Sequence, residues 1–163
     1  MRADHEELVL RNPAITACAF WHFARNFAES AEGKAPTLPY FFVVVGMTFH
    51  RATVDKVRRM LFDSGITKAI AERPDIVAGL QERIETYAPT ALTGLQVGAS
   101  SGLLLREGGA GFPSFRAEGP DLPKPLRQTV SDITDIYGTA RRMGSWFAED
   151  DFPTLCRRLM IEF

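Results

Sequence analysis

The segment at residues 91–116, ALTGLQVGASSGLLLREGGAGFPSFR, constrains the fold of this chain more than any other. It starts as an apolar, helix-like stretch and continues into two short strand-like runs, LLLRE and FPSFR, which are separated by Gly108, Gly109, Ala110 and Gly111. A glycine-rich turn between two such runs predicts a β-hairpin. A helix followed by a hairpin is the order of the second half of a winged helix, whose wing we expect at about residues 103–117. Such an element either reads nucleic acid or holds other proteins.

Outside this segment, the spacing of the apolar residues predicts helices. Asn12 and Pro13 are typical of a helix start, and Gly33 is typical of a helix end. In residues 37–49 the three consecutive valines favour a strand, whereas the start and the length favour a buried helix, which we predict. The expected helices are 14–32, 37–49, 51–62, 66–72, one that begins at Pro74, one from Pro89 to about Ser101, 126–148 and 152–159. Three prolines predict an extended connector at residues 118–126.

Length and composition indicate one folded domain. The chain has 163 residues, of which 45% are hydrophobic and 24% are charged. We predict a mostly α, winged-helix-like single domain with a small β-hairpin wing, an N-terminal helix and a C-terminal helical extension. Its parts are expected to be an N-terminal tail at residues 1–11, a helical core with the winged element at 12–117, and a linker with the C-terminal extension at 118–163.

The charge pattern argues against a helix that reads DNA. The net charge is −1, so any contact with DNA must come from a local patch. The helix before the hairpin has no lysine or arginine between Pro89 and Gly102, although base and phosphate contacts need such side chains. The densest basic segment is 51–59, in which Lys56, Arg58 and Arg59 are the candidates for nucleic-acid contacts. For this segment we favour the alternative to nucleic-acid contact, which is a charged helix face exposed to solvent.

No catalytic or metal-binding pattern is present in the sequence, so we expect no enzyme activity, catalytic residue, metal or cofactor. The three histidines are far apart and lack a carboxylate or cysteine at helical spacing. Cys18 and Cys156 are expected to be buried thiols in a reducing cytoplasm. The start of the chain does not have the pattern of a signal peptide, and the apolar run 38–49 is shorter than the roughly 20 residues that span a bilayer. We therefore expect a cytoplasmic protein without a membrane segment.

Four blocks of the sequence together resemble a known family. They are RNPAITACAFWHFARNF, LPYFFVVVGMTFHRATVDKV, ERPDIVAGLQERIETYAPTALTGLQVGASSGLLLRE and ARRMGSWFAEDDFPTLCRRLMIEF. Over residues 11–163 the chain resembles the middle component of bacterial three-component ABC-ATPase systems (ABC-3C), which are Lamassu-like SMC defence systems. The resemblance implies a non-enzymatic adaptor or scaffold in an anti-phage or anti-plasmid defence complex. Its partners would be an SMC/Rad50-like ABC ATPase and an effector subunit of the toxin or nuclease type, with DNA reached through the complex.

The rival class is a small winged-helix DNA-binding transcription regulator. Its phosphate contacts would come from the basic side chains Arg51, Lys56, Arg58, Arg59, Arg141 and Arg142.

The C-terminal segment is the expected partner interface, with Trp146, Phe147, Leu159 and Phe163 as its candidate residues. Adjacent aromatic residues on one helix point about 100° apart, so one of Trp146 and Phe147 is expected to meet a second surface. In the alternative, this segment folds back over the first helix of the chain, near Phe20 and Phe23.

Overall fold

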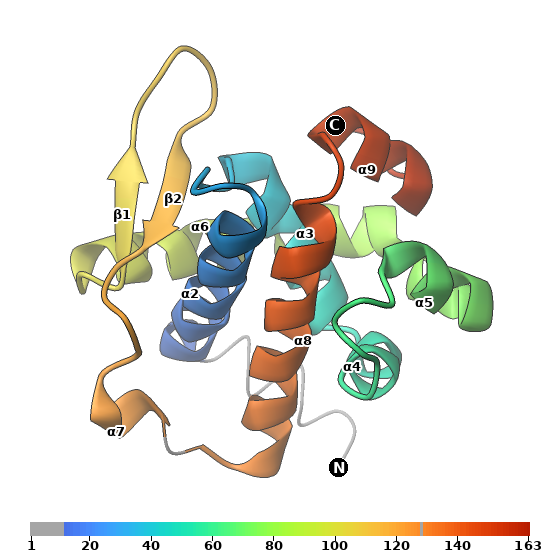
Figure 1. Ribbon diagram of the computed structural model, residues 1–163, viewed down its shortest axis with the longest axis horizontal. Helices are drawn as coiled ribbons and strands as arrows, with labels where there is room; N and C mark the ends of the chain where they lie inside the picture. The colour runs from blue at the N-terminus through green and yellow to red at the C-terminus, as the bar shows by residue number, and fades with distance from the viewer. Residues whose placement is uncertain (1–11, 128) are drawn as a thin grey trace.

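The structure is a computed structural model that describes residues 12–127 and 129–163. It is mostly helical with one antiparallel hairpin, so the predicted fold class is confirmed (Figure 1). The helices are α2 (Pro13–Ser30), α3 (Leu38–Thr48), α4 (Arg51–Val57), α5 (Ile66–Glu72), the 3-10 turn η1 (Pro74–Ile76), α6 (Leu80–Ser100), α7 (Lys124–Arg127), α8 (Ser131–Phe147) and α9 (Phe152–Leu159). The strands are β1 (Leu104–Glu107) and β2 (Ser114–Ala117).

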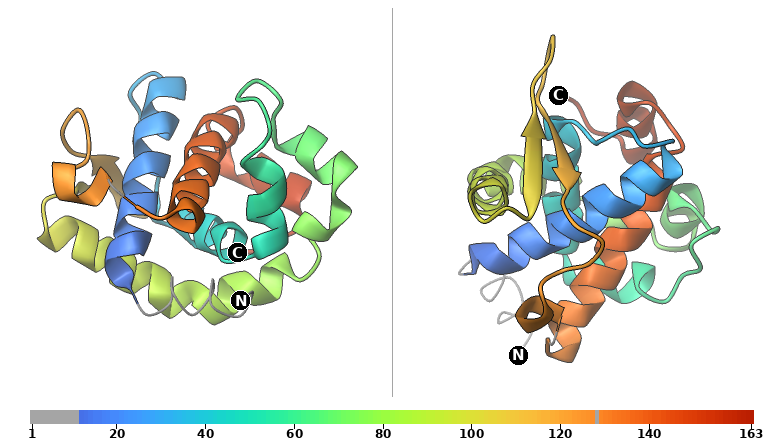
Figure 2. Two further views of the ribbon diagram at one scale, coloured as in Figure 1. Left: turned by 90° about the horizontal axis from the view of Figure 1, so that it is seen from below. Right: turned by 60° about the vertical axis from the view of Figure 1, so that its left-hand side comes forward.

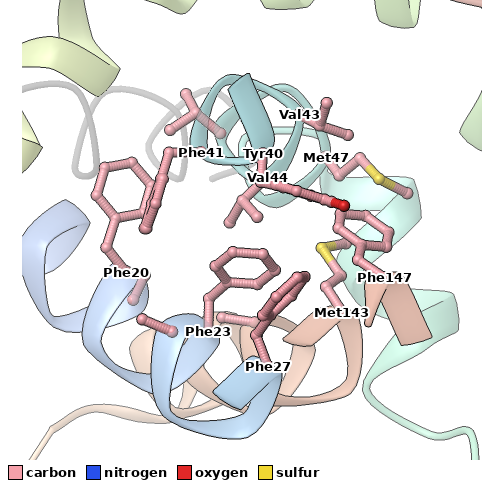
Figure 3. Packing of buried hydrophobic residues seen from close by; sticks show 14 of the residues in the cluster. Phe20, Phe23, Phe27, Tyr40, Phe41, Val43, Val44, Met47, Met143 and Phe147 are labelled. Atoms are coloured by element: carbon pink, nitrogen blue, oxygen red, sulfur yellow. The ribbon is translucent and has the colours of Figure 1, made fainter. Parts of the chain in front are cut away.

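The centre of the molecule is formed where α2, α3 and α8 pack together (Figure 3). The Phe23 ring of α2 lies 5.5 Å from the ring of Phe41 in α3 and 5.9 Å from that of Phe147 in α8, measured between centroids. Both contacts are edge-to-face, the arrangement that aromatic rings prefer. Where α2 and α8 pack together, Gly144 of α8 lies directly against the backbone of α2. The first and the last long helices of the chain therefore share one core.

Several predicted helices have the expected bounds, because local signals define their ends. Asn12 caps α2 through its Oδ1 atom, which accepts a hydrogen bond from the backbone N–H of Ala14 at 3.1 Å. Residues 66–72 and 152–159 are helical as predicted. The valine-rich segment is the helix α3, as predicted, and most of its residues are buried. A helix surrounded by other elements needs an apolar sequence on all sides, which explains why its periodicity is weak.

Four predicted boundaries are wrong. Helix α4 ends at Val57 instead of residue 62, and helix α8 begins at Ser131 instead of residue 126, after the short helix α7. The predicted helix starts at Pro74 and Pro89 are also wrong, because Pro74 begins only the turn η1, and α6 is continuous with Pro89 inside it. Pro89 is on the exposed side of α6. A carbonyl that loses its N–H partner there can bind water, so the helix tolerates the proline.

The wing lies within the predicted range, residues 103–117. Strands β1 and β2 are antiparallel, with Leu105 opposite Arg116, and their turn extends away from the helices (Figure 2). The indole Nε1 of Trp21 in α2 donates a hydrogen bond of 2.8 Å to the carbonyl of Glu118, just after β2. Ser114 of β2 also forms an isolated antiparallel β-bridge with Thr37, which precedes α3. The hairpin is thus attached to α2 and to the start of α3.

His22 is placed among aromatic rings between α2 and α8. Its ring centroid lies 5.1 Å from that of Trp21 and 4.9 Å from that of Tyr137. Burial, followed by the positive charge of Arg141, lowers the pKa of His22 to about 4. The side chain is therefore neutral in the folded chain at pH 7.

We expect His22 to make the fold sensitive to acid. Between pH 6.5 and pH 4 the unfolded chain binds a proton at this position that the folded chain does not bind, so the free energy of unfolding falls as the pH falls. From pH 7 to pH 5 this contribution amounts to about 2 kcal/mol. Urea unfolding of the wild type and of His22→Phe at both pH values measures it. The variant should lose about 2 kcal/mol less than the wild type, and equal losses would contradict the assignment.

Candidate partner-binding surfaces

The outward face of α6 occupies the position of a recognition helix, immediately before the wing, but it carries no cation. Its exposed residues are Glu82, Glu85, Thr86, Pro89, Leu92, Thr93, Gln96 and Ser100. Arg83, the one basic residue of α6, donates hydrogen bonds to the carbonyls of Gly46, Ile76 and Ala78 and serves the packing of the helix. A face with two carboxylates and no cation repels phosphate groups.

The glycines of α6 face the interior of the molecule. A Cβ atom on Gly94 would lie 2.5 Å from the Thr16 side chain in α2, and one on Gly98 would lie 2.7 Å from Leu104 in β1. Both positions are buried. The small residues therefore allow neighbouring elements to approach α6 closely.

A groove of about 370 Å³ lies between α6 and the hairpin, and we call it the wing groove. Its lining is mostly apolar, and Leu92, at its edge, is 50% exposed. The lining residues are Leu38, Leu92, Leu95, Gln96, Ala99, Ser100, Arg106, Pro113 and Phe115. Arg106 is the one charged side chain among them.

The charges of the hairpin are mostly used within the chain. The Nε atom of Arg116 donates to a Glu107 carboxylate oxygen at 2.6 Å, and its Nη1 atom donates to the Gly33 carbonyl at 2.8 Å. Arg106 has no ion pair within the part of the chain that the structure describes. It is the cation of the wing that stays available to a partner.

A second groove, of about 720 Å³, is lined in part by the basic segment 51–59, in which the candidates for nucleic-acid contacts lie. Carboxylates neutralise two of its three candidate residues, because Lys56 pairs with Glu72 and Arg58 lies 3.5 Å from Asp135. Arg59 is exposed and forms no ion pair with any described residue. The groove is lined by Arg51, Asp55, Lys56, Arg58, Arg59, Met60, Leu61, Ser64, Lys68, Glu72 and Arg73. The observed pairing is typical of a solvated ionic face.

Within residues 12–127 and 129–163, no group of three or more histidine, cysteine or acidic side chains is arranged to hold a metal ion. In the same residues, no helix is both long and apolar enough to cross a membrane.

Residues 1–163 match the family described as ABC-three component (ABC-3C) system Middle Component 3. The chain belongs to this family. The resemblance to a middle component is thereby confirmed, and the family name associates this Middle Component 3 chain with the other components of a three-component system. No curated protein and no solved structure matches the chain significantly.

Three of the four C-terminal candidate residues of this Middle Component 3 chain lie in its own core. Trp146, Phe147 and Leu159 are almost completely buried, so they present no surface to a partner in the folded chain. The expectation that Trp146 or Phe147 reaches beyond the chain is wrong. Helix α8 has neighbours on two sides: Phe147 packs against Phe23 of α2, and Trp146 donates from Nε1 to the Phe62 carbonyl at 2.8 Å.

The fourth candidate, Phe163, remains accessible at the C-terminal end of the Middle Component 3 chain. It is 63% exposed, and its ring contacts those of Phe42 and Phe152. The three rings provide an apolar surface beside α9.

Proposed function

We propose that this Middle Component 3 chain is a non-enzymatic adaptor that links an SMC/Rad50-like ABC ATPase to an effector subunit. The complex would be a cytoplasmic, Lamassu-like defence assembly that acts against phages or plasmids, with an effector of the toxin or nuclease type. Membership of the family supports a role among other components. The lack of a cation on the outer face of α6 is the observation that carries the adaptor role, because a winged element without cations on that face is suited to protein surfaces rather than to base edges.

Two surfaces could serve such a role. The wing groove combines an apolar lining with one available cation. Phe163 and its neighbouring rings form a further apolar surface beside α9. Exposed apolar surfaces suit an adaptor, since it must hold two partners at once.

Co-expression of the chain with the products of its neighbouring genes tests the proposal. An affinity tag on this chain should recover an ABC ATPase, and size-exclusion chromatography should show the proteins in one peak. Mass spectrometry then identifies the recovered subunits. A chain that stays alone under these conditions would contradict the adaptor role.

The alternative, a DNA-binding regulator, has one observation in its favour, which is the exposed and unpaired Arg59 in the basic groove of the described chain. That alternative predicts that the isolated chain binds duplex DNA and that Arg59→Glu lowers the slope of log affinity against log salt by about 1. The adaptor proposal predicts weak binding by the isolated chain without sequence preference. Fluorescence anisotropy with a labelled duplex at several salt concentrations distinguishes the two functions.

A further inference from the structure

We propose that the wing groove receives a segment of another component of the complex, in which an apolar side chain stands next to a carboxylate. The apolar side chain enters between α6 and the hairpin, and the carboxylate pairs with Arg106. This inference rests on the proposed adaptor function and assigns one of its partner contacts to named residues.

The apolar part of the segment is inferred from the lining of the groove. Leu38, Leu95 and Phe115 contribute side chains from three separate elements, and the partly exposed Leu92 continues this surface outward. At about 370 Å³ the groove is near the lower end of the range for small binding pockets. It therefore suits one or two side chains rather than a whole helix. Burying an apolar side chain there removes Leu92 from water as well.

The groove is already formed in the chain by itself. The backbone N–H of Leu38 donates to the carbonyl of Pro113 at 2.8 Å, and that of Phe115 donates to the carbonyl of Pro36 at 3.0 Å. From inside the core, the ring of Phe41 supports Phe115 with a centroid distance of 5.5 Å. A preformed groove binds a segment with little reorganisation of its own side chains.

The carboxylate of the segment is inferred from the charge at the rim. Arg106 is the only charged lining residue, and it has no ion pair within the described part of the chain. The neighbouring acid, Glu107, is already engaged by Arg116. A guanidinium group beside an apolar surface favours a carboxylate, which it binds through two parallel hydrogen bonds. The partner segment is therefore expected to be acidic and apolar.

The location also agrees with the exposed hydrophobic side chains near the wing. Phe112 in the hairpin turn is 65% exposed, and Leu105 is about half exposed on the outer face of β1. Leu105 is opposite Arg116 and so lies on the other face of the hairpin from Arg106 and Phe115, whereas Leu92 lies in the lining of the wing groove itself. Charge depletion with apolar anchors in the middle is typical of the central part of a protein interface.

The experiment uses the full chain, co-expressed with the products of its neighbouring genes and recovered through a tag on this chain. Leu92→Asp and Arg106→Glu alter the groove in two independent ways. Leu61→Asp and Arg59→Glu are the matched controls, because they make the same chemical changes at exposed positions of the basic groove. Circular dichroism melting of each variant verifies the fold, which these exposed substitutions should preserve. Light scattering of the isolated chain measures its oligomeric state.

We expect both groove variants to reduce the recovery of one partner by about tenfold, whereas the two controls recover it like the wild type. Full recovery by both groove variants, while the wild type assembles, would overturn this inference and leave the adaptor function standing. An isolated chain that forms a dimer, with Leu92→Asp converting it to a monomer, would assign the groove to a second copy and also overturn it. A wild-type chain that recovers no partner would overturn the adaptor function together with this contact.

Discussion

Removal of residues 152–163 is expected to unfold the chain rather than only to release a partner. The deleted segment contains Leu155, Leu159 and Ile161, which are buried, and Phe152, which is packed against the core. Loss of one large aliphatic side chain from a core costs about 2–5 kcal/mol. Three such losses together approach the whole stability of an ordinary domain, which is about 5–15 kcal/mol. Circular dichroism during heating should show no cooperative transition for the truncated chain.

Two point variants test whether this segment is packed in the core without removing it from the chain. Leu159→Ala should lower the free energy of unfolding by about 2–5 kcal/mol, because the side chain is fully buried. The adjacent Met160 is 71% exposed, so Met160→Ala should change the stability by less than about 0.5 kcal/mol. A truncated chain that melts like the wild type, or equal effects of the two variants, would contradict the placement of α9 in the core.

Gly144→Ala is expected to destabilise the chain by about 2–3 kcal/mol. A Cβ atom at this position would lie 2.5 Å from the carbonyl oxygen of Phe23 and 2.9 Å from the backbone nitrogen of Phe27. Neither is the end of a flexible side chain, so α2 and α8 must move apart to admit a methyl group. The strain exceeds the gain of up to about 1 kcal/mol that alanine brings to a helix.

Gly138→Ala is the matched control on the same helix. The nearest atom to its added Cβ would be the Nη1 atom of Arg142, at 3.4 Å, and a flexible side chain can adjust. This variant should be as stable as the wild type or more stable, by up to about 1 kcal/mol. Urea unfolding at pH 7 measures both variants. If Gly144→Ala were as stable as Gly138→Ala, α2 and α8 would not be in backbone contact.

Much of the fold could be predicted because its signals are local in the sequence. Asn12 and Asp151 cap their helices through hydrogen bonds to backbone N–H groups two or three residues away. The hairpin was predictable from the glycines between its two strands. The lack of cations in the second half of α6 was equally visible, and the structure adds that the single arginine of this helix is occupied by backbone carbonyls.

The errors arise where tertiary packing decides the outcome. Pro89 is a helix-start signal in isolation, yet the exposed side of α6 accommodates it within a continuous helix. The adjacent Trp146 and Phe147 do meet two different surfaces, as their spacing requires, but both surfaces belong to the same chain. Sequence spacing gives the directions of side chains and does not identify which element lies opposite.

The candidate site was the least predictable part. The wing groove joins Leu38, Leu95 and Phe115, which belong to separate elements and share no sequence motif. Its one usable signal was the count of charges in residues 103–118, which contain two arginines and two glutamates. That count could not show that Arg116 is paired while Arg106 is available.

Hydrogen exchange of the isolated chain and of the assembled complex, followed by mass spectrometry, tests most directly whether the winged element of this chain holds proteins. Backbone amides within residues 92–117 are expected to exchange more slowly in the complex, while those within residues 51–73 exchange at unchanged rates. Duplex DNA added to the isolated chain should protect neither region. Protection of residues 51–73 by duplex DNA, with residues 92–117 unaffected by assembly, would contradict a protein-binding role of the winged element.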